Sequence, residues 1–436
     1  MKSGELTRSS VLVRALPIMG ANIATPLVGL VDFAVIGNTE NATAIAAVAL
    51  GTMVFNALFW ALGFLRMGST ALAAQADGDG TPGESLAVLW RALGVGGFLG
   101  LIIVLLQSPI RDAGLWIFSG DSAVEAETAA YIEARIWAAP ATLAGFGLYG
   151  WLIGMGLTGR ALILQLILNL FNIAFSLLFV LQFNWGVSGV AAASALAQWL
   201  HIIAGLVLIG PIIHRSLQPD LSQIIKRDAV LRLLAVNRDI FLRTLALLAG
   251  FYWFNEASVR LGPDILAGNA ILLQFITISA FFLDAFAHIT EAETGRAAGA
   301  KDWPRLKRAF RLTSELAAAS ALLLGLVFAL AGTHFIEFMA EDADVRAVAS
   351  AALLWCALAP IAGWPSFQLD GLMIGTTRGA LMRNAMAASL VLYLIADFTL
   401  RPNFGLDGLW IAFIFYYVAR AGTLALGLPG LKRDFS

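Results

Sequence analysis

Apolar runs long enough to cross a lipid bilayer follow one another along almost the whole chain. A helix needs about 20 mostly apolar residues to span the hydrocarbon core. Twelve stretches of the sequence meet that length, and they cover residues 11–37, 44–75, 86–108, 126–152, 160–183, 187–213, 233–260, 264–295, 309–332, 346–373, 379–400 and 406–428. Lipid offers no hydrogen-bond partners to the backbone, and none of the runs has the ten-residue alternation of a β-barrel strand. We therefore predict an all-α integral membrane protein with twelve transmembrane helices.

Composition and motif content argue against other classes of protein. Of the 436 residues 59% are hydrophobic and only 13% are charged, whereas soluble domains carry about a quarter charged residues. The net charge of −1 gives no electrostatic basis for binding nucleic acid. We find no metal-ligand spacing, phosphate-binding loop or nucleophile motif. We expect no nucleic-acid partner, metal, organic cofactor or catalytic residue.

The distribution of positive charge predicts the orientation. With twelve spans, both termini lie on one side of the membrane. The loops on that side carry twenty Lys and Arg residues, and the opposite loops carry only Arg111, Arg260, Arg346 and Arg401. Because positively charged loops stay in the cytoplasm, we predict a multi-pass protein of a bacterial cytoplasmic (inner) membrane with both termini in the cytoplasm.

The sequence also repeats itself across a basic, polar segment at its middle. FNWGVSGVA (183–191) resembles PNFGLDGLW (402–410), and the Gly-x-x-Gly pattern recurs at an offset of 219 residues. Each half holds six spans, an even number, so the two repeats run in the same direction through the membrane. We predict two pseudo-symmetric six-helix lobes, residues 1–213 and 233–436, joined by a cytoplasmic connection over residues 214–232.

Asp32 is a carboxylate late in the first apolar span. A charge at the bilayer centre costs about 2.5–3.5 kcal/mol on insertion scales, so such residues usually mark ion or substrate pathways. Pro26 precedes it in the same span and is expected to kink the helix. Since an apolar environment favours the neutral form of a carboxyl group, we predict that Asp32 is a proton switch. The alternative is a structural aspartate bonded to a neighbouring helix.

Polar side chains in the fifth and sixth spans are candidate partners for this carboxylate. Gln165, Asn169, Asn172 and Ser176 follow one another at spacings of three or four, and Ser194 is likewise followed by Gln198, so each set shares a helix face. We predict that they hydrogen-bond Asp32 and line an N-lobe substrate cavity. Amides and hydroxyls also join membrane helices without any further role, and that alternative stays open.

The second half has its own titratable residues. Asp284, His288 and Glu291 lie on one face of the eighth span, where they form either a proton relay or a static network. Glu256 is the expected repeat counterpart of Asp32. Asp370 follows two prolines in the tenth span. The charged residues near the middle of the spans are mostly acidic, and this favours cationic cargo.

Several separated segments resemble the multidrug and toxic compound extrusion (MATE) family, and most of all its DinF-like subgroup. They are LVGLVDFAVIG (27–37), FLRMGSTALAAQA (64–76), FLDAFAHITEAETGRAAGA (282–300) and LDGLMIGTTRGALMRNAM (369–386). The resemblance covers essentially the whole chain. It implies a V-shaped, MOP-type bundle of two lobes that alternates between outward- and inward-open states. It also implies drug efflux driven by an inward proton or sodium gradient.

The resemblance assigns roles to individual residues of the N-lobe. The family's first-span coupling acid falls on Asp32, and the kink proline of its close relatives falls on Pro26. The fifth-span asparagine falls on Asn172 and the sixth-span hydroxyl on Ser194. The acid often found one turn after that asparagine is Ser176 here, which leaves Asp32 as the titrating group that the resemblance assigns in the N-lobe.

In the C-lobe, Asp284 and Asp370 fit the DinF-like pattern. Glu256 does not occupy the acidic position of the sodium-coupled, NorM-like members, so a sodium site like theirs is not favoured. We therefore expect a proton-coupled multidrug antiporter, with sodium as the alternative ion. Its cargo would be hydrophobic, often cationic drugs or toxic metabolites, and we expect a monomer surrounded by membrane lipid.

Two further alternatives belong to other classes. A flippase for lipid-linked oligosaccharides would need a strongly basic central cavity for pyrophosphate. An intramembrane lipid-modifying enzyme would need a catalytic pair, and only His288 with Asp284 or Glu291 comes near one.

Overall fold

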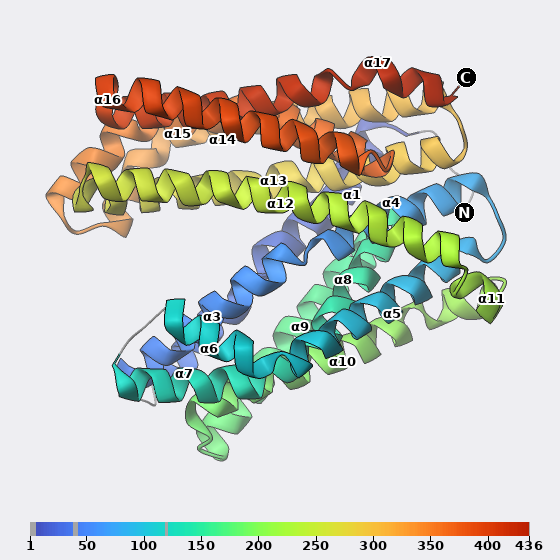
Figure 1. Ribbon diagram of the computed structural model, residues 1–436, viewed down its shortest axis with the longest axis horizontal. Coiled ribbons are helices and arrows are strands. Elements are labelled where there is room, and N and C mark those ends of the chain that lie inside the picture. The colour runs from blue at the N-terminus through green and yellow to red at the C-terminus, as the bar shows by residue number, and fades with distance from the viewer. Residues whose placement is uncertain (1–5, 38–41, 118–120, 436) are drawn as a thin grey trace. The chain divides into compact units, whose positions relative to one another are not determined.

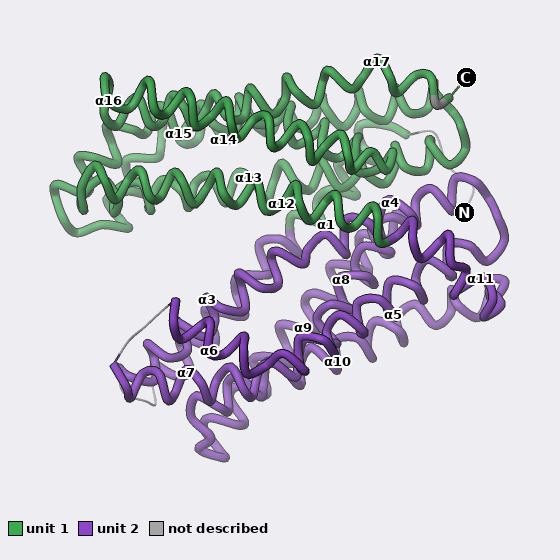
Figure 2. The backbone as a smooth tube through the Cα atoms, viewed as in Figure 1, with its two compact units in different colours: residues 1–19, 234–436 green, residues 20–233 purple. Residues whose placement is uncertain are grey.

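The computed structural model describes residues 6–37, 42–117 and 121–435, and these residues form helices joined by short connections (Figure 1). No strand occurs among them. They divide into two compact units, one of residues 20–233 and one that combines residues 1–19 with residues 234–436 (Figure 2). The division falls inside the first helix, α1 (Arg8–Ala24). Below, unit 2 is residues 20–233 and unit 1 is the remainder.

Unit 2 contains the end of α1 and the helices that follow it, up to the first part of α12. They are α2 (Leu27–Gly37), α3 (Ala42–Ala61), α4 (Phe64–Asp79), α5 (Glu84–Leu105), α6 (Gln107–Ile117), α7 (Ser122–Arg135), η1 (Ile136–Ala138), α8 (Ala139–Gly154), α9 (Thr158–Leu177), η2 (Leu178–Gln182), α10 (Gly186–Arg215) and α11 (Leu221–Ile224). Trp151 is fully buried in one of its cores, and its indole N–H donates to the Ser85 carbonyl over 2.7 Å.

Unit 1 is built from longer helices. They are α12 (Arg227–Leu261), α13 (Pro263–Gly299), α14 (Trp303–Met339), α15 (Ala343–Gly375), α16 (Gly379–Ala425), α17 (Leu428–Leu431) and η3 (Lys432–Phe435). At 1.5 Å per residue, a helix of 37 residues such as α13 or α14 is about 55 Å long and exceeds the thickness of the hydrocarbon core.

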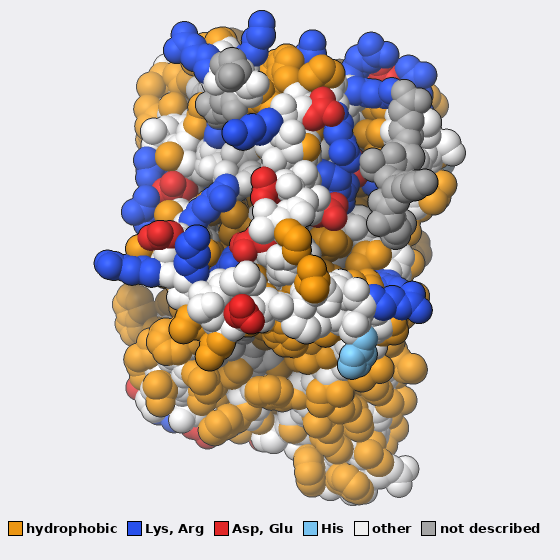
Figure 3. Space-filling model, turned by 90° about the vertical axis from the view of Figure 1, so that its right-hand side faces the viewer, with side chains coloured by type: hydrophobic (Ala, Val, Ile, Leu, Met, Phe, Trp, Pro, Cys, Tyr) orange, Lys and Arg blue, Asp and Glu red, His pale blue; other side chains and the backbone are white. Residues whose placement is uncertain are grey.

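The surface of the helices agrees with a lipid environment. Many large apolar side chains are exposed on the surface, among them Phe338 at 90% and Leu330 at 75% exposure. Figure 3 shows one face on which Lys, Arg, Asp and Glu side chains gather over one part, while hydrophobic side chains cover much of the rest.

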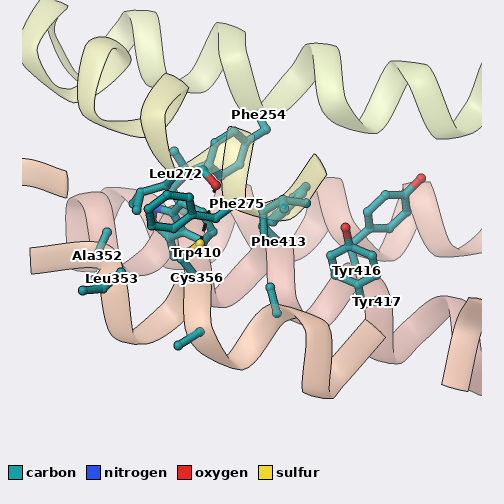
Figure 4. Close-up of a cluster of buried hydrophobic side chains, with 14 of the residues drawn as sticks. Phe254, Leu272, Phe275, Ala352, Leu353, Cys356, Trp410, Phe413, Tyr416 and Tyr417 are labelled. Carbon is teal, nitrogen blue, oxygen red and sulfur yellow. Dashed lines mark hydrogen bonds between the residues drawn. The ribbon is translucent and has the colours of Figure 1, made fainter. Parts of the chain in front are cut away.

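Aromatic side chains dominate the core of unit 1 (Figure 4). Phe254 of α12 packs against Trp410 and Phe413 of α16, with ring centroids 5.1 and 4.7 Å apart. Cys356 of α15 is buried in the same cluster, and its thiol donates to the Leu272 carbonyl over 3.5 Å. These contacts hold α12, α13, α15 and α16 together.

The N-terminal part of α1 belongs to unit 1 and packs against α13 of the same unit. Val11, Ala15 and Ile18 are buried against Phe286 and Ile289 of α13.

Ten helices or joined helix pairs of the described residues are long and apolar enough to cross a membrane. The predicted eleventh and twelfth spans form one of these ten, because α16 runs through both of them across a kink at Gly405. The predicted seventh span lies in α12, which carries too many charged and polar residues to be one of the ten. If α16 is counted as two spans and α12 as one more, the ten apolar segments agree with twelve crossings.

The backbone supports the internal repeat. Gly186 has φ +51° and Gly405 has φ +54°, and these two glycines are separated by the repeat offset of 219 residues. A positive φ of this kind is adopted by glycine without the steric cost that other residues incur. Both Gly-x-x-Gly motifs thus begin with a glycine of positive φ.

Candidate functional site

The first predicted span is interrupted at Pro26, because α1 ends at Ala24 and α2 begins at Leu27. A helix end leaves carbonyl groups without partners inside the helix. The side-chain amide of Asn169 on α9 donates to the Ala24 carbonyl over 2.7 Å, and Gln165 donates to the Asn169 side-chain oxygen over 3.2 Å. The polar face of α9 therefore stabilises the break that precedes Asp32.

Asp32 lies inside unit 2 with only 1% of its surface exposed. The Ser176 hydroxyl of α9 donates to its Oδ1 over 3.1 Å, and the Ser194 hydroxyl of α10 donates to its Oδ2 over 3.2 Å. A carboxylate taken out of water needs such donors. The predicted polar faces of the fifth and sixth spans meet at this carboxylate.

Ser194 is the centre of the hydrogen-bond network. Its O–H donates to Asp32, and its oxygen accepts from the Asn172 amide over 2.9 Å and from Arg135 Nη1 over 3.2 Å. A hydroxyl has one donor and two acceptor positions, so Ser194 uses all of them. Ser194 therefore links Asp32 to both Asn172 and Arg135.

Arg135, the last residue of α7, supplies a positive charge next to Asp32. Its Nη1 lies 3.8 Å from Asp32 Oδ2. The guanidinium also lies over the rings of Phe55 and Tyr131, with its Cζ 5.6 and 5.5 Å from their centroids, and donates to the Tyr131 hydroxyl. At this separation two opposite charges attract by about 4 kcal/mol for an effective dielectric constant near 20.

These contacts show what protonation of Asp32 would do. The proton removes the negative charge, and with it the attraction that holds Arg135 near the carboxyl group. It also adds an O–H donor to one carboxyl oxygen and leaves that oxygen a weaker acceptor, so its hydrogen bond from a serine hydroxyl is weakened. The site can therefore exist in two hydrogen-bond arrangements, selected by one proton.

The two serines are not equivalent, and this leads to a prediction. Ser194→Ala leaves the buried donors of Asn172 and Arg135 without their acceptor, and an unsatisfied buried polar group costs about 1–3 kcal/mol. Ser176→Ala removes one hydrogen bond, worth about 1 kcal/mol. We expect the Ser194 variant to have the lower melting temperature in detergent; equal melting temperatures would contradict the central place of Ser194.

Tyr131 depends on a close approach to Gly51 of α3. A Cβ atom at position 51 would lie 2.9 Å from Tyr131 Cγ and nearer still to other ring atoms. Gly51→Ala therefore has to displace the ring that supports Arg135, at a cost of about 1–3 kcal/mol. The measurement is thermal unfolding, with Gly94→Ala on α5 as control, because nothing lies within 4 Å of a Cβ there. A Gly51 variant as stable as the Gly94 variant would contradict this packing.

Unit 1 holds a second buried ionic cluster, around Asp370 of α15. Arg243 of α12 and Arg420 of α16 both donate to Asp370 Oδ2. All three residues are at most 5% exposed. Two arginines surround one aspartate here, so basic side chains are buried in this unit as well as acidic ones.

The other candidates of the second half belong to helices α12 and α13 of unit 1. His288 Nδ1 is 3.8 Å from Glu291 Oε2 within α13, and Asp284 lies one turn before His288 on the same helix. Glu256 pairs with Arg260 one turn along α12, over 3.1 Å, with 36% of its side chain exposed. Among the residues that the structure describes, no group of three His, Cys, Asp or Glu side chains could hold a metal ion.

Sequence reasoning missed four charged residues. Three are Arg135, Arg243 and Arg420, each of which interrupts an apolar stretch. The fourth is Asp397 of α16, which is fully buried and accepts from Trp253 Nε1 over 2.9 Å and from Arg401 over 3.1 Å. The cost of an unpaired charge in lipid was a usable signal, because a buried acid requires a basic partner or hydrogen-bond donors.

A family model described as MatE matches residues 17–178 and 242–399 of the chain. This chain belongs to the MatE family. Among its relatives is DNA damage-inducible protein F of Escherichia coli K12, 36% identical over 94% of this chain and 90% of that protein. Protein DETOXIFICATION 44, chloroplastic, of Arabidopsis thaliana is 23% identical over 95% of this chain and 81% of that protein.

Solved structures share the fold. The outward-facing conformation of a multidrug resistance MATE family transporter of the MOP superfamily gives a TM-score of 0.88 at 17% identity, covering 98% of this chain and 96% of that chain. A MOP superfamily transporter from Pyrococcus furiosus, whose description reports a reversed polarity of its binding pocket, gives 0.87 at 16% identity over 98% and 97%.

The family assignment decides several predictions. The resemblance to MATE proteins and to the DinF-like subgroup is confirmed, as is the all-helical membrane fold. The protein is a multi-pass membrane transporter of the MATE multidrug efflux family, and the intramembrane-enzyme alternative is excluded. Its family membership implies small-molecule substrates.

Proposed function

We propose that this MatE protein exports hydrophobic, often cationic compounds in exchange for protons, and that Asp32 carries the proton. One observation supports this most: Asp32 is buried in a membrane-spanning segment, directly after a helix break, and is held by two hydroxyls and one guanidinium. This is an environment in which one proton changes the interactions of several helices.

Coupling requires that proton and cargo favour different states of the protein. In the proposed cycle, deprotonated Asp32 binds Arg135 and the serines while cargo is bound. A proton from outside neutralises the carboxyl group, the polar contacts rearrange, α2 moves relative to α1 at the Pro26 break, and cargo leaves. We further propose a monomer with both termini in the cytoplasm, which the excess of basic residues in the loops on that side supports.

The test is transport by the purified protein in liposomes, with a proton gradient and a sodium gradient imposed separately on the same preparation. The probe is the cationic dye ethidium. We expect the proton gradient alone to drive its movement. Movement driven only by the sodium gradient would replace the proton by sodium as coupling ion, and movement with neither gradient would overturn the antiport.

A further inference from the structure

The ionic cluster of unit 1 contains more positive than negative charge. Arg243, Asp370 and Arg420 lie on three different helices, α12, α15 and α16, and both guanidinium groups contact the same carboxylate oxygen. One carboxylate balances one guanidinium, so the three side chains keep a net charge of +1. A charge of that kind inside a membrane domain marks a functional pathway by default.

The hydrogen bonds of the cluster are also incomplete. The Nε atoms of Arg243 and Arg420 and the Oδ1 atom of Asp370 are buried and have no hydrogen-bond partner in the described part of the chain. A guanidinium group presents five N–H donors in a planar fork, and here two such forks share a single carboxylate oxygen. The donors therefore exceed what Asp370 accepts.

Aromatic side chains lie next to the guanidinium groups. Arg420 Cζ is 5.4 Å from the centroid of the Phe367 ring, and the Phe367 and Tyr417 rings are stacked with centroids 6.5 Å apart. Tyr416 donates its hydroxyl hydrogen to Met386 Sδ over 3.2 Å. Rings and a thioether suit the apolar body of an amphiphile, while the paired forks suit a planar oxyanion.

We propose that Arg243 and Arg420 bind the carboxylate of amphiphilic cargo, and that Asp370 is the internal carboxylate which this cargo displaces. In the structure Asp370 occupies the position that the ligand would take. A purely structural triad is a poor explanation, because buried ion triads contribute little stability beyond what apolar residues provide. The inference rests on the proposed function in one respect, namely that the ligand is exported.

The probes are a matched pair of dyes, rhodamine B, which bears a free carboxylate, and its ethyl ester, which does not. Binding to the purified full-length protein in detergent is measured by fluorescence anisotropy, without any ion gradient. We expect Arg243→Lys and Arg420→Lys to weaken rhodamine B binding by about tenfold, because lysine keeps the charge but loses the planar fork. Binding of the ester should change less than about twofold.

Asp370→Asn is expected to increase the affinity for rhodamine B, whereas the lysine variants decrease it. Without the competing carboxylate, rhodamine B should bind about fivefold more tightly, and it should raise the melting temperature of this variant more than the ester does. A merely structural Asp370 would give a less stable protein that neither dye rescues selectively. The control is Arg91→Lys on α5, a buried arginine that contacts Glu84 and backbone carbonyls of unit 2; it should leave both affinities unchanged.

Equal losses for the two dyes in the lysine variants, or no difference between the dyes with the wild-type protein, would overturn the anion site. The proposed function is judged separately by gradient-driven ethidium transport. If ethidium transport responds to the proton gradient while the dye pair shows no discrimination, only the anion site fails. If the dye pair discriminates but no gradient drives transport, the site stands and the antiport fails.

Discussion

Asp32→Asn is expected to reduce proton-driven efflux of ethidium from liposomes to the rate seen without protein. Asparagine has nearly the same size, and its single side-chain oxygen still accepts a hydrogen bond from one of the two serines, while its NH2 group replaces the other oxygen and can only donate. The asparagine side chain does not titrate. The variant therefore keeps the shape of the site and loses the step that couples it to the gradient. The measurement is dye movement after a pH jump, compared with wild-type protein at equal incorporation.

Asp112→Asn is the matched control. Asp112 lies on α6 with 64% of its side chain exposed and contacts only Arg111 in the described ion pairs, so its loss should leave transport unchanged. Proton-driven efflux by the Asp32 variant at a rate close to that of the control would contradict the role of Asp32. An Asp32 variant that still binds ethidium would show that the loss concerns coupling.

Arg135→Gln is expected to destabilise the protein by about 3–5 kcal/mol, because removing one partner leaves the other as an uncompensated buried charge. The effect should be larger than for Arg111, because solvent screens its pair with Glu133, whose side chains are 32% and 53% exposed. Unfolding in detergent, followed by the loss of a monodisperse gel-filtration peak on heating, measures the difference.

The double variant Asp32→Asn/Arg135→Gln separates charge pairing from packing. When both charges are absent, the penalty for an unpaired charge disappears, so the double variant should be more stable than Arg135→Gln alone. Transport should stay absent in the double variant. If the two substitutions destabilise the protein additively, the charges do not interact and the pairing of Asp32 with Arg135 is wrong.

Helix lengths and breaks are the features that the sequence predicts well. Each apolar run of about 20 residues must satisfy its backbone internally, so the runs appear as helices with little dependence on their neighbours. Pro26 removes a backbone donor, and α1 ends two residues before it. The break between α3 and α4 at residues 62–63 carries no proline, and its sequence signal is the weaker one of Gly63.

Pairing between helices is where sequence reasoning fails. The spacing of Asn172 and Ser176 shows that they share a face, but the position of Arg135 opposite that face depends on the packing of α7 against α10. The cost of placing Arg135 within an apolar span indicates that it needs a partner, but nothing local identifies the helix that supplies this partner. The same holds for Arg243 and Arg420, which come from helices far apart in sequence and meet only through Asp370.

The internal repeat predicts the backbone at equivalent positions better than it predicts which charged side chains are buried there. Gly186 and Gly405 both have a positive φ. Glu256, the expected counterpart of Asp32, instead forms an exposed pair with Arg260. The two units therefore share a helical plan while their buried polar clusters differ, one with a single arginine beside an aspartate and the other with two.

The exchange of one proton for cargo at residue 32 is tested most directly by counting protons released when ethidium binds. Calorimetric titration of the purified protein in two buffers of different ionisation enthalpy, repeated across the neutral pH range, gives that number. Competition at Asp32 predicts a release that approaches one proton per ethidium where the free protein holds the carboxyl group protonated, and none from Asp32→Asn. Equal proton release by the wild-type protein and the Asp32→Asn variant would contradict the account.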